Sequence, residues 1–326
     1  MPWELRDGEP SVDPALVHAL LSEQHPDLAH LPLAEPVRGW DNTMVRLGER
    51  LALRLPRHAQ AETLLDREVA WLPRLASQLA ARSAQSGTGD PALQTIPARP
   101  AVPAFPAIPT PARTGVPRPG YPFRCAVVPW VEGTPAVHVP REVRDAYAPS
   151  LAATLRGLHQ PAPADAPASA FRGIDLAEIE DGFVRRWEAQ AGDLGRERRD
   201  QLARVWRRAV EAAPYSGPRV WLHGDPHPNN TVLAGVGPWP GPKPGSPVLV
   251  DFGDLCAGDP ASDVGSALLH FSPAGRDAFV TAYDAGRVPD PDLWARAQGW
   301  AVNYALIFAA QSPAEVLRPL GRDLLS

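Results

Sequence analysis

The stretch from Val220 to Leu233 concentrates residues whose types and spacing could do chemistry. It contains His223-Gly224-Asp225, followed closely by Asn229 and Asn230. A second motif, Val-Asp-Phe-Gly-Asp, lies further along the chain and ends at Asp254. Residues 231–234 and 248–250 are β-like, and the Gly/Pro-rich segment between them predicts a turn, so the two runs should pair as an antiparallel hairpin. The hairpin would place Asn230, just before the first strand, beside Asp251, just after the second.

Phosphoryl transfer is the chemistry that this arrangement suits. An amide oxygen and a carboxylate at one point are ligands for a hard cation such as Mg2+. Asp225, five residues before Asn230 on the entering loop, can face the same point and orient and deprotonate an attacking hydroxyl. We therefore expect Asp225 to be the catalytic base and Asn230 and Asp251 to hold the metal. The alternative is three polar residues that cap the ends of a hairpin.

The first part of the chain has the pattern of a small β-rich body. Apolar residues at helical spacing predict a helix over 11–30, two β-like runs follow at 42–47 and 50–55, and a second amphipathic helix is expected over 58–82. Residues 83–122 then carry so many prolines that a helix interior and a central strand are excluded. We expect a polyproline-like insertion there, ending in an edge strand.

The second part of the chain is mainly helical by pattern. A short apolar strand is expected at 125–131, helices at 143–159 and 176–213, β structure over 219–254, and mostly helix from there to residue 326. The chain therefore consists of a small β-rich part with one long helix, a linker, and a larger helical part that carries the hairpin.

The combination of His223-Gly224-Asp225, Asn230 and Asp251-Phe252-Gly253 resembles the aminoglycoside phosphotransferase family. That family shares its fold with choline kinases, macrolide kinases and protein kinases, and the resemblance covers nearly the whole chain apart from the proline-rich insertion. It implies an α+β, protein-kinase-like two-lobe fold with a small β-rich N-lobe and a larger, mainly helical C-lobe. The implied boundaries are an N-terminal lobe at 1–128 with the insertion at about 83–122, a hinge at 129–134, and a C-terminal lobe at 135–326.

The resemblance also implies where a nucleotide would bind. Asn42 and Thr43 fall at the end of the expected phosphate-covering loop. Arg54 occupies the position where the family usually has a phosphate-binding lysine; it stays charged and can fork onto two oxygens, and Lys243 is the only lysine in the chain. Glu68 lies on the border of its helix's apolar stripe, where a lone carboxylate is costly to bury, so we expect it to pair with Arg54.

The family resemblance also implies roles for residues of the hinge and of the catalytic loop. The expected hinge is where the family's backbone meets the nucleotide base, which places Trp130 and Val131 there. His223 is expected to support the catalytic loop, and Asp263, at a helix start, to accept backbone N–H groups and brace that loop. His227 is better interpreted as a turn residue than as a ligand.

The composition of the chain limits the classes of molecule to which it is expected to bind and the compartment in which it is expected to work. The net charge of −5 argues against a nucleic-acid partner, and the two cysteines, Cys125 and Cys256, suit a reducing cytoplasm. Nothing resembles a signal peptide, and no apolar run approaches the roughly 20 residues that cross a bilayer. We expect a cytoplasmic monomer or homodimer without a membrane partner.

The expected reaction moves the γ-phosphoryl group of ATP or GTP, with Mg2+, to a hydroxyl of a small-molecule acceptor. The acceptor would be an aminoglycoside or another antibiotic, or alternatively a choline- or sugar-like metabolite. The acceptor pocket is expected among the helices after residue 135, including the segment with Trp294, Trp300, Asn303 and Tyr304. Nearby acidic residues could attract an aminoglycoside or simply form a solvated face: Asp175, Glu178, Glu180 and Asp181.

Other functions compete with this hypothesis. Residues 224–227 resemble a metallophosphatase fragment, but the further His, Asn and Asp motifs of a two-metal hydrolase are missing. The absent strand lysine would allow a non-catalytic nucleotide-binding module. A protein kinase is disfavoured because Asp263 follows Gly253 by only ten residues, which leaves no room for a peptide-docking loop.

Overall fold

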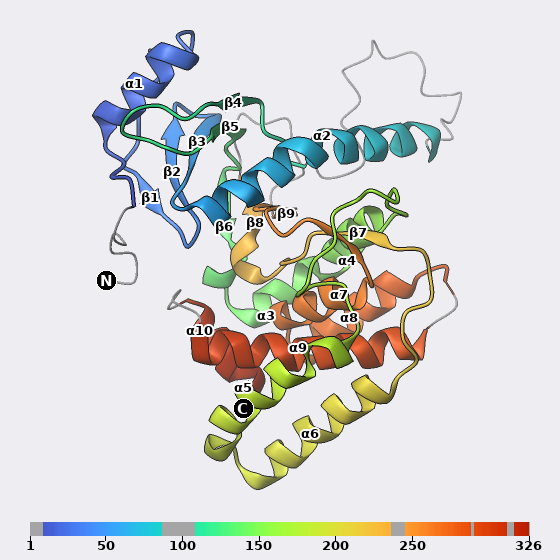
Figure 1. Cartoon of the computed structure of the whole chain (residues 1–326). Coiled ribbons are helices and arrows are strands. Elements are labelled where there is room, and N and C mark those ends of the chain that lie inside the picture. Colours follow the sequence, from blue (N-terminus) through green and yellow to red (C-terminus); the bar gives the residue numbers. More distant parts are fainter. Residues whose placement is uncertain (1–8, 87–107, 236–244, 288–289, 312–315, 326) are drawn as a thin grey trace. The chain divides into compact units, whose positions relative to one another are not determined.

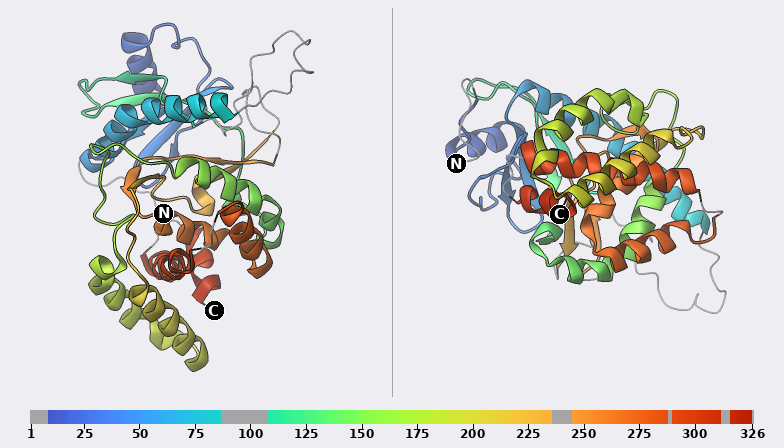
Figure 2. Two further views of the ribbon diagram at one scale, coloured as in Figure 1. Left: turned by 90° about the vertical axis from the view of Figure 1, so that its right-hand side faces the viewer. Right: turned by 90° about the horizontal axis from the view of Figure 1, so that it is seen from below.

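The computed structural model describes residues 9–86, 108–235, 245–287, 290–311 and 316–325. The chain forms two compact units. The first contains residues 1–133 and 234–244, and the second contains residues 134–233 and 245–326. Figure 1 labels the elements of both units, and Figure 2 shows them from two further directions.

The first unit is built on an antiparallel sheet with the strand order β1-β2-β3-β5-β4. Its elements are α1 (Pro14–Gln24), β1 (Val37–Arg38), β2 (Asn42–Leu47), β3 (Leu51–Pro56), α2 (Ala59–Ser86), β4 (Arg113–Gly115) and β5 (Cys125–Pro129). The turn between β2 and β3 contains Gly48 at φ 58, a left-handed conformation that glycine adopts without a steric cost.

Alternation along the strands separates the two faces of this sheet. Leu53 and Leu55 of β3 pack with Leu20 and Leu21 of α1 in one buried cluster. Ala52, which directly precedes Leu53 in β3, packs in a second cluster with apolar residues of α2. Because successive side chains of a strand point to opposite faces, each even-numbered residue of β3 lies on the α2 face.

The proline-rich segment is described only in part. Helix α2 continues four residues beyond the expected end, to Ser86, with Pro73 inside it. Residues 87–107, which hold much of the expected insertion, lie outside the described residues. After them, β4 pairs with β5 alone and is the edge of the sheet.

The second unit is mainly helical and carries two small sheets, β6-β8-β9 and β10-β7. Its strands are β6 (Gly133–Pro135, at the boundary), β7 (Val220–Leu222), β8 (Thr231–Ala234), β9 (Pro247–Leu249) and β10 (Cys256–Gly258). Its helices are α3 (Arg141–Arg144), α4 (Ala148–Leu158), α5 (Glu180–Gln190), α6 (Arg196–Glu211), α7 (Ala261–Ala267), α8 (Pro273–Asp284), α9 (Pro291–Gln311) and α10 (Leu317–Leu325). Helix α9 packs against α5, α6, α7 and α10, and Figure 1 shows it running through the middle of this helical body.

The single helix expected over 176–213 is wrong in its continuity. A 3-10 turn at Leu176–Ile179 leads into α5, a second turn at Ala191–Asp193 follows, and α6 starts afresh at Arg196. The break falls on Ala-Gly-Asp-Leu-Gly, where Gly195 has the extended backbone of a helix N-cap (ψ 143). Two glycines within four residues are strong helix breakers, and they outweighed the apolar periodicity on either side.

Among the described residues, no helix combines the length and apolar character needed to span a membrane.

Candidate active site

The β8–β9 hairpin brings together the two expected metal ligands. Thr231 pairs with Leu249, and the Val250 amide donates to the Asn230 carbonyl at 3.0 Å. Asp251 therefore leaves the second strand beside the residue that enters the first. Its backbone is left-handed, with φ 62, a conformation that aspartate tolerates better than most residues. Its side chain lies at the surface.

The donor atoms at this point are oxygens. The Asn230 side-chain amide donates to the backbone carbonyl of Asp225 at 3.2 Å, and within the described chain its amide oxygen accepts no hydrogen bond. No group of three or more His, Cys, Asp or Glu side chains that could hold a metal occurs among the described residues. The pair of Asn230 and Asp251 fits Mg2+, which typically uses one or two carboxylates together with water and phosphate oxygens.

Gly224 gives the His-Gly-Asp segment its shape. Its φ is 89, and a Cβ atom placed there would collide with the backbone and Cβ of Asp254. A side chain at position 224 would thus strain the backbone and push the Asp-Phe-Gly-Asp turn away from the loop. The glycine lets these two segments lie in contact.

Asp263 anchors the same loop from α7. Its carboxylate is fully buried and accepts the backbone N–H groups of His223 at 2.7 Å and Gly224 at 2.9 Å. The His159 ring lies 3.2 Å away through Nε2 and contacts the Tyr283 hydroxyl through Nδ1 at 2.7 Å. Asp263 is the third residue of α7, in its first turn, and the amides that it binds belong to the catalytic loop.

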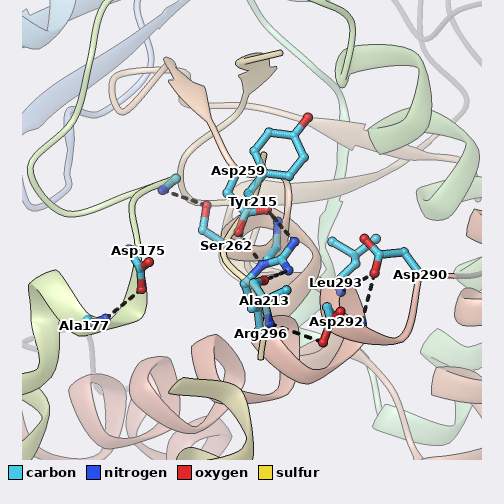
Figure 3. A network of polar contacts seen from close by, with 12 residues as sticks. Asp175, Ala177, Ala213, Tyr215, Asp259, Ser262, Asp290, Asp292, Leu293 and Arg296 are labelled. Atoms are coloured by element: carbon cyan, nitrogen blue, oxygen red, sulfur yellow. Dashed lines mark hydrogen bonds and ion pairs between the residues drawn. The ribbon is translucent and has the colours of Figure 1, made fainter. Parts of the chain in front are cut away.

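The segment before α7 is held by its own polar network (Figure 3). Arg296 of α9 donates through Nε to Asp259 at 2.7 Å and through Nη1 to the Ala213 carbonyl at 2.6 Å. The Ser262 hydroxyl accepts the Gly173 amide at 3.0 Å. These contacts fix the start of α7, and with it the position of Asp263.

His223 lies at the centre of the loop and is fully buried. Its Nε2 is 3.1 Å from the Val250 carbonyl, its Nδ1 accepts the Asp225 amide at 3.2 Å, and its ring packs on Phe252 with centroids 4.4 Å apart. Burial lowers the pKa of His223 despite its acidic neighbours. The neutral ring thus ties the catalytic loop to the end of the β8–β9 hairpin.

Asp225 is held as a carboxylate by two basic neighbours, His227 and Arg172. His227 Nε2 lies 3.2 Å from Oδ2, and Arg172 Nη2 lies 3.8 Å from Oδ1. Burial alone would raise the pKa of Asp225, but His227 and Arg172 outweigh it and hold that pKa well below its usual range. Oδ1 accepts no hydrogen bond from the described residues, although the side chain is 20% exposed.

Two neighbours of Asp225 are not predicted by the sequence. His227 is a turn residue, since its Nδ1 accepts the amides of Asn229 and Asn230, but its other nitrogen contacts Asp225; its position two residues after Asp225 was the available signal. Arg172 reaches the site from a loop, where its Nε donates to the Gly224 carbonyl at 2.7 Å. Nothing in the spacing of the chain marks Arg172.

The first unit pairs Arg54 with Glu68. Arg54 Nη1 lies 2.6 Å from Glu68 Oε1, and the two side chains are 7% and 3% exposed. Arg54 is an even-numbered residue of β3 and so lies on the α2 face, where Glu68 occupies the same side as Leu65. The strand and helix periodicities together make this ion pair.

The other expected nucleotide contacts are also placed within the first unit. Asn42 and Thr43 are buried in β2. Trp130 and Val131 follow β5 and are half-buried; the Trp130 indole donates to Glu132 at 3.2 Å. The contacts of these four residues with a nucleotide stay a prediction.

The segment expected to line the acceptor pocket has mixed surroundings. Trp300, Asn303 and Tyr304 are buried in α9, and the Trp294 indole donates to Asp284. The acidic residues Asp175, Glu178, Glu180 and Asp181 are exposed. Asp175 and Glu178 form the capping box of a short 3-10 turn, so these two carboxylates already have a structural role.

Residues 33–300 match the sequence profile of the Phosphotransferase enzyme family, APH. The chain belongs to this family. It is therefore a phosphotransferase of the kinase type, and its α+β fold, a small antiparallel sheet with helices and a larger helical part, is the family's. No curated protein sequence matches the chain.

Solved structures of other phosphotransferases are similar to the chain in fold. The GDP complex of wild-type aminoglycoside 2'-phosphotransferase-IIIa has a TM-score of 0.66 at 16% identity, over 96% of this chain and 97% of that one. The GDP and kanamycin complex of APH(2")-IIia has a TM-score of 0.64 at 16% identity, over 95% and 97%. The macrolide 2'-phosphotransferase MphH from Brachybacterium faecium has a TM-score of 0.54 at 17% identity, over 95% and 98%.

Proposed function

We propose that this phosphotransferase moves the γ-phosphoryl group of ATP or GTP to a hydroxyl group of a small-molecule acceptor. The observation that carries the proposal is the hairpin register, which sets Asn230 beside Asp251 while the Asn230 side chain donates to the backbone of Asp225. One loop thus presents a carboxylate for the attacking hydroxyl next to a pair of oxygen ligands for a metal.

In the proposed reaction the Asp225 carboxylate accepts a hydrogen bond from the acceptor hydroxyl and takes its proton. The acceptor oxygen forms a bond to the γ-phosphorus, the bond from that phosphorus to the bridging oxygen breaks, and the nucleoside diphosphate leaves. Because His227 and Arg172 keep the pKa of Asp225 low, the carboxylate is ionised at neutral pH and a weak base. Its main contribution is then to orient the hydroxyl, as a loose phosphoryl-transfer transition state requires.

Asn230 and Asp251 are the proposed magnesium ligands, and the bound ion would offset the charge of the phosphate oxygens. Arg54, fixed by Glu68, is the proposed phosphate-binding cation. Asn42, Thr43, Trp130 and Val131 are the proposed neighbours of the nucleotide, and His223 and Asp263 hold the loop. Two similar structures are GDP complexes, which supports a nucleotide co-substrate and makes GTP worth testing beside ATP.

Aminoglycosides and macrolides are the first acceptors to test, because the enzymes of similar fold are named after these two classes of compound. Choline- and sugar-like metabolites are the alternative within the same reaction. A non-catalytic nucleotide-binding module is the alternative outside it, since arginine stands where the family usually has lysine.

The test measures release of nucleoside diphosphate with ATP and with GTP against aminoglycosides, macrolides, choline and hydroxylated metabolites. Asp225→Asn is nearly isosteric and should lower acceptor-dependent turnover by about a thousandfold or more. Asp165→Asn, at an exposed position, is the matched control and should act like the wild type. Equal rates for Asp225→Asn and the wild type with every acceptor would favour the non-catalytic module.

A further inference from the structure

An unusual group of polar atoms lies next to Asp225 in the second unit. Among the described residues, Asp225 Oδ1, the Tyr304 hydroxyl and Arg186 Nε are buried without a hydrogen-bond partner. Buried polar atoms are nearly always paired, because leaving them unpaired costs free energy. Other buried atoms of the second unit, such as Trp300 Nε1 and Ser266 Oγ, also lack a partner, but these three include the proposed base and an arginine, and so indicate a place where a polar ligand supplies the missing partners.

Arg172 links Asp225 with Tyr304, and Arg186 contacts the residue that precedes Tyr304 in α9. The Arg172 guanidinium lies 3.8 Å from Asp225 and 5.2 Å from the centre of the Tyr304 ring. The next residue toward the start of α9, Asn303, accepts a hydrogen bond from Arg186 Nη2 at 2.7 Å. Burial raises the pKa of the Tyr304 hydroxyl, so this group stays protonated and can donate.

Arg186 has no carboxylate partner among the described residues. Its one hydrogen bond goes to the neutral Asn303, and Nη1 donates to no described group. Burial lowers the pKa of Arg186, and the charged neighbours that lower it further, Arg185 and Arg172, are both cations. A half-buried cation whose charged neighbours are also cations is stabilised when an anion binds to it.

We propose that Arg186 and Arg172 form an anion-binding subsite beside Asp225, and that the acceptor carries a carboxylate or phosphate group near the hydroxyl that is phosphorylated. The occupant is a small hydroxylated anion, with Tyr304 as an additional donor to its oxygens. This inference rests on the proposed kinase function and makes its acceptor more specific. It favours the metabolite alternative, because two arginines repel a polycationic aminoglycoside.

The geometry suits an anion for a further reason. A guanidinium presents several N–H donors in a plane and binds carboxylate and phosphate oxygens in pairs. Arg172 is already held by the Gly224 carbonyl and faces the carboxylates of Asp225 and Asp254, so it adds positive charge beside Asp225 and the open donors come from Arg186. Arg186, on α5, still has N–H donors available. Its replacement should therefore weaken the binding of the acceptor's anionic group.

The first experiment does not require turnover. Inorganic phosphate is titrated at constant ionic strength, without nucleotide or magnesium, into the wild type, Arg186→Met and Arg185→Met, and the melting temperature is followed. Arg185 is the adjacent, exposed arginine of α5, so its variant loses the same charge from the same helix. Phosphate should stabilise the wild type and Arg185→Met, and Arg186→Met clearly less. An equal phosphate response in all three proteins overturns the subsite, whatever the enzyme phosphorylates.

The second experiment uses turnover with matched acceptors: glycerate against glycerol, gluconate against sorbitol, phosphorylated against unphosphorylated sugars, and kanamycin. The inference expects the anionic member of a pair to be preferred and its KM to rise about 10- to 100-fold in Arg186→Met, with kcat little changed and Arg185→Met near the wild type. Efficient kanamycin turnover that Arg186→Met leaves unchanged overturns the inference while the kinase function stands. A phosphate response that depends on Arg186, with no Asp225-dependent turnover of any acceptor, retains the subsite and rejects the kinase function.

Discussion

The Nε2 atom of His227 lies 3.2 Å from the Oδ2 atom of Asp225, while the other ring nitrogen of His227 caps the short turn that leads to Asn230. One side chain therefore positions the proposed base and shapes the loop behind it. The two roles can be separated, because asparagine also caps turns and helix starts well.

His227→Asn should keep the cap and lose the contact with Asp225. We expect its kcat to fall about tenfold or more, because Asp225 loses its nearest orienting partner, with the melting temperature close to that of the wild type. His227→Ala should lose both activity and several degrees of melting temperature. Steady-state kinetics and thermal unfolding of the two variants provide the check; full activity in His227→Asn would show that the contact does not matter.

Asp263→Asn should destabilise the second unit. The carboxylate accepts two backbone N–H groups in a fully buried place, and the amide replaces one acceptor oxygen by a donor and removes the charge. Hydrogen bonds to a buried charged group contribute about 1.5–3 kcal/mol each, so the free energy of unfolding should fall by about 2–4 kcal/mol. Urea unfolding measures it, with the exposed Asp165→Asn as the control; a difference below about 0.5 kcal/mol would contradict the anchor.

Arg54 and Glu68 should behave as a buried pair. Arg54→Met leaves the Glu68 charge buried alone and should cost about 3–5 kcal/mol of unfolding free energy. Arg54→Met combined with Glu68→Leu should recover most of that stability and still lack nucleotide-dependent activity. Arg50→Met, at an exposed position of the same strand region, is the control. If the double variant were no more stable than Arg54→Met, the pair would not be what stabilises this side of the sheet.

Asp251→Asn tests the metal site without disturbing the backbone, because asparagine is also tolerated at a positive φ. Removing the carboxylate should raise the magnesium concentration for half-maximal activity by about tenfold or more and lower the maximal rate. Magnesium titrations of the variant and of the exposed Asp277→Asn make the comparison. Unchanged magnesium dependence would assign the ion to other ligands.

His270 predicts a stability change below neutral pH. Burial lowers its pKa to about 3, with Arg144 and His227 adding to the shift, while its ring contacts the Tyr147 hydroxyl and the Pro226 carbonyl. Between that value and about 6.5, the ordinary value, the unfolded chain binds a proton that the folded protein does not, so stability falls as the pH falls. The loss is about 1.4 kcal/mol per pH unit at most.

His270→Gln offers the comparison, because glutamine can still donate to the Pro226 carbonyl but does not titrate. Its unfolding free energy should vary less steeply from pH 6.5 to 4 than that of the wild type. Parallel curves for the two proteins would show that His270 does not carry the dependence.

Local signals in the sequence predicted much of the arrangement around Asp225. The hairpin that joins Asn230 to Asp251 follows from two β-like runs around a turn, a periodicity that the chain displays directly. In the first unit, the expected Arg54–Glu68 pair rests on the place of Glu68 at the border of its helix's apolar stripe and on the family resemblance, which identifies Arg54 as the strand cation.

The relations that escaped prediction are long-range ones. Arg172 donates a hydrogen bond to Gly224, 52 residues further along the chain. No local pattern in the sequence predicts which distant segment a loop residue will contact. The break before Arg196 is marked in the sequence by Gly192 and Gly195, which end the helix although apolar residues continue at helical spacing on both sides.

The hydrogen bond from His223 to Asp263 joins residues forty positions apart. During synthesis, the His-Gly-Asp segment therefore leaves the ribosome well before the residue that anchors it. A nascent chain that stops short of residue 263 contains the whole motif without the carboxylate that holds its amides. Competence for chemistry should therefore arise late in translation, when α7 docks.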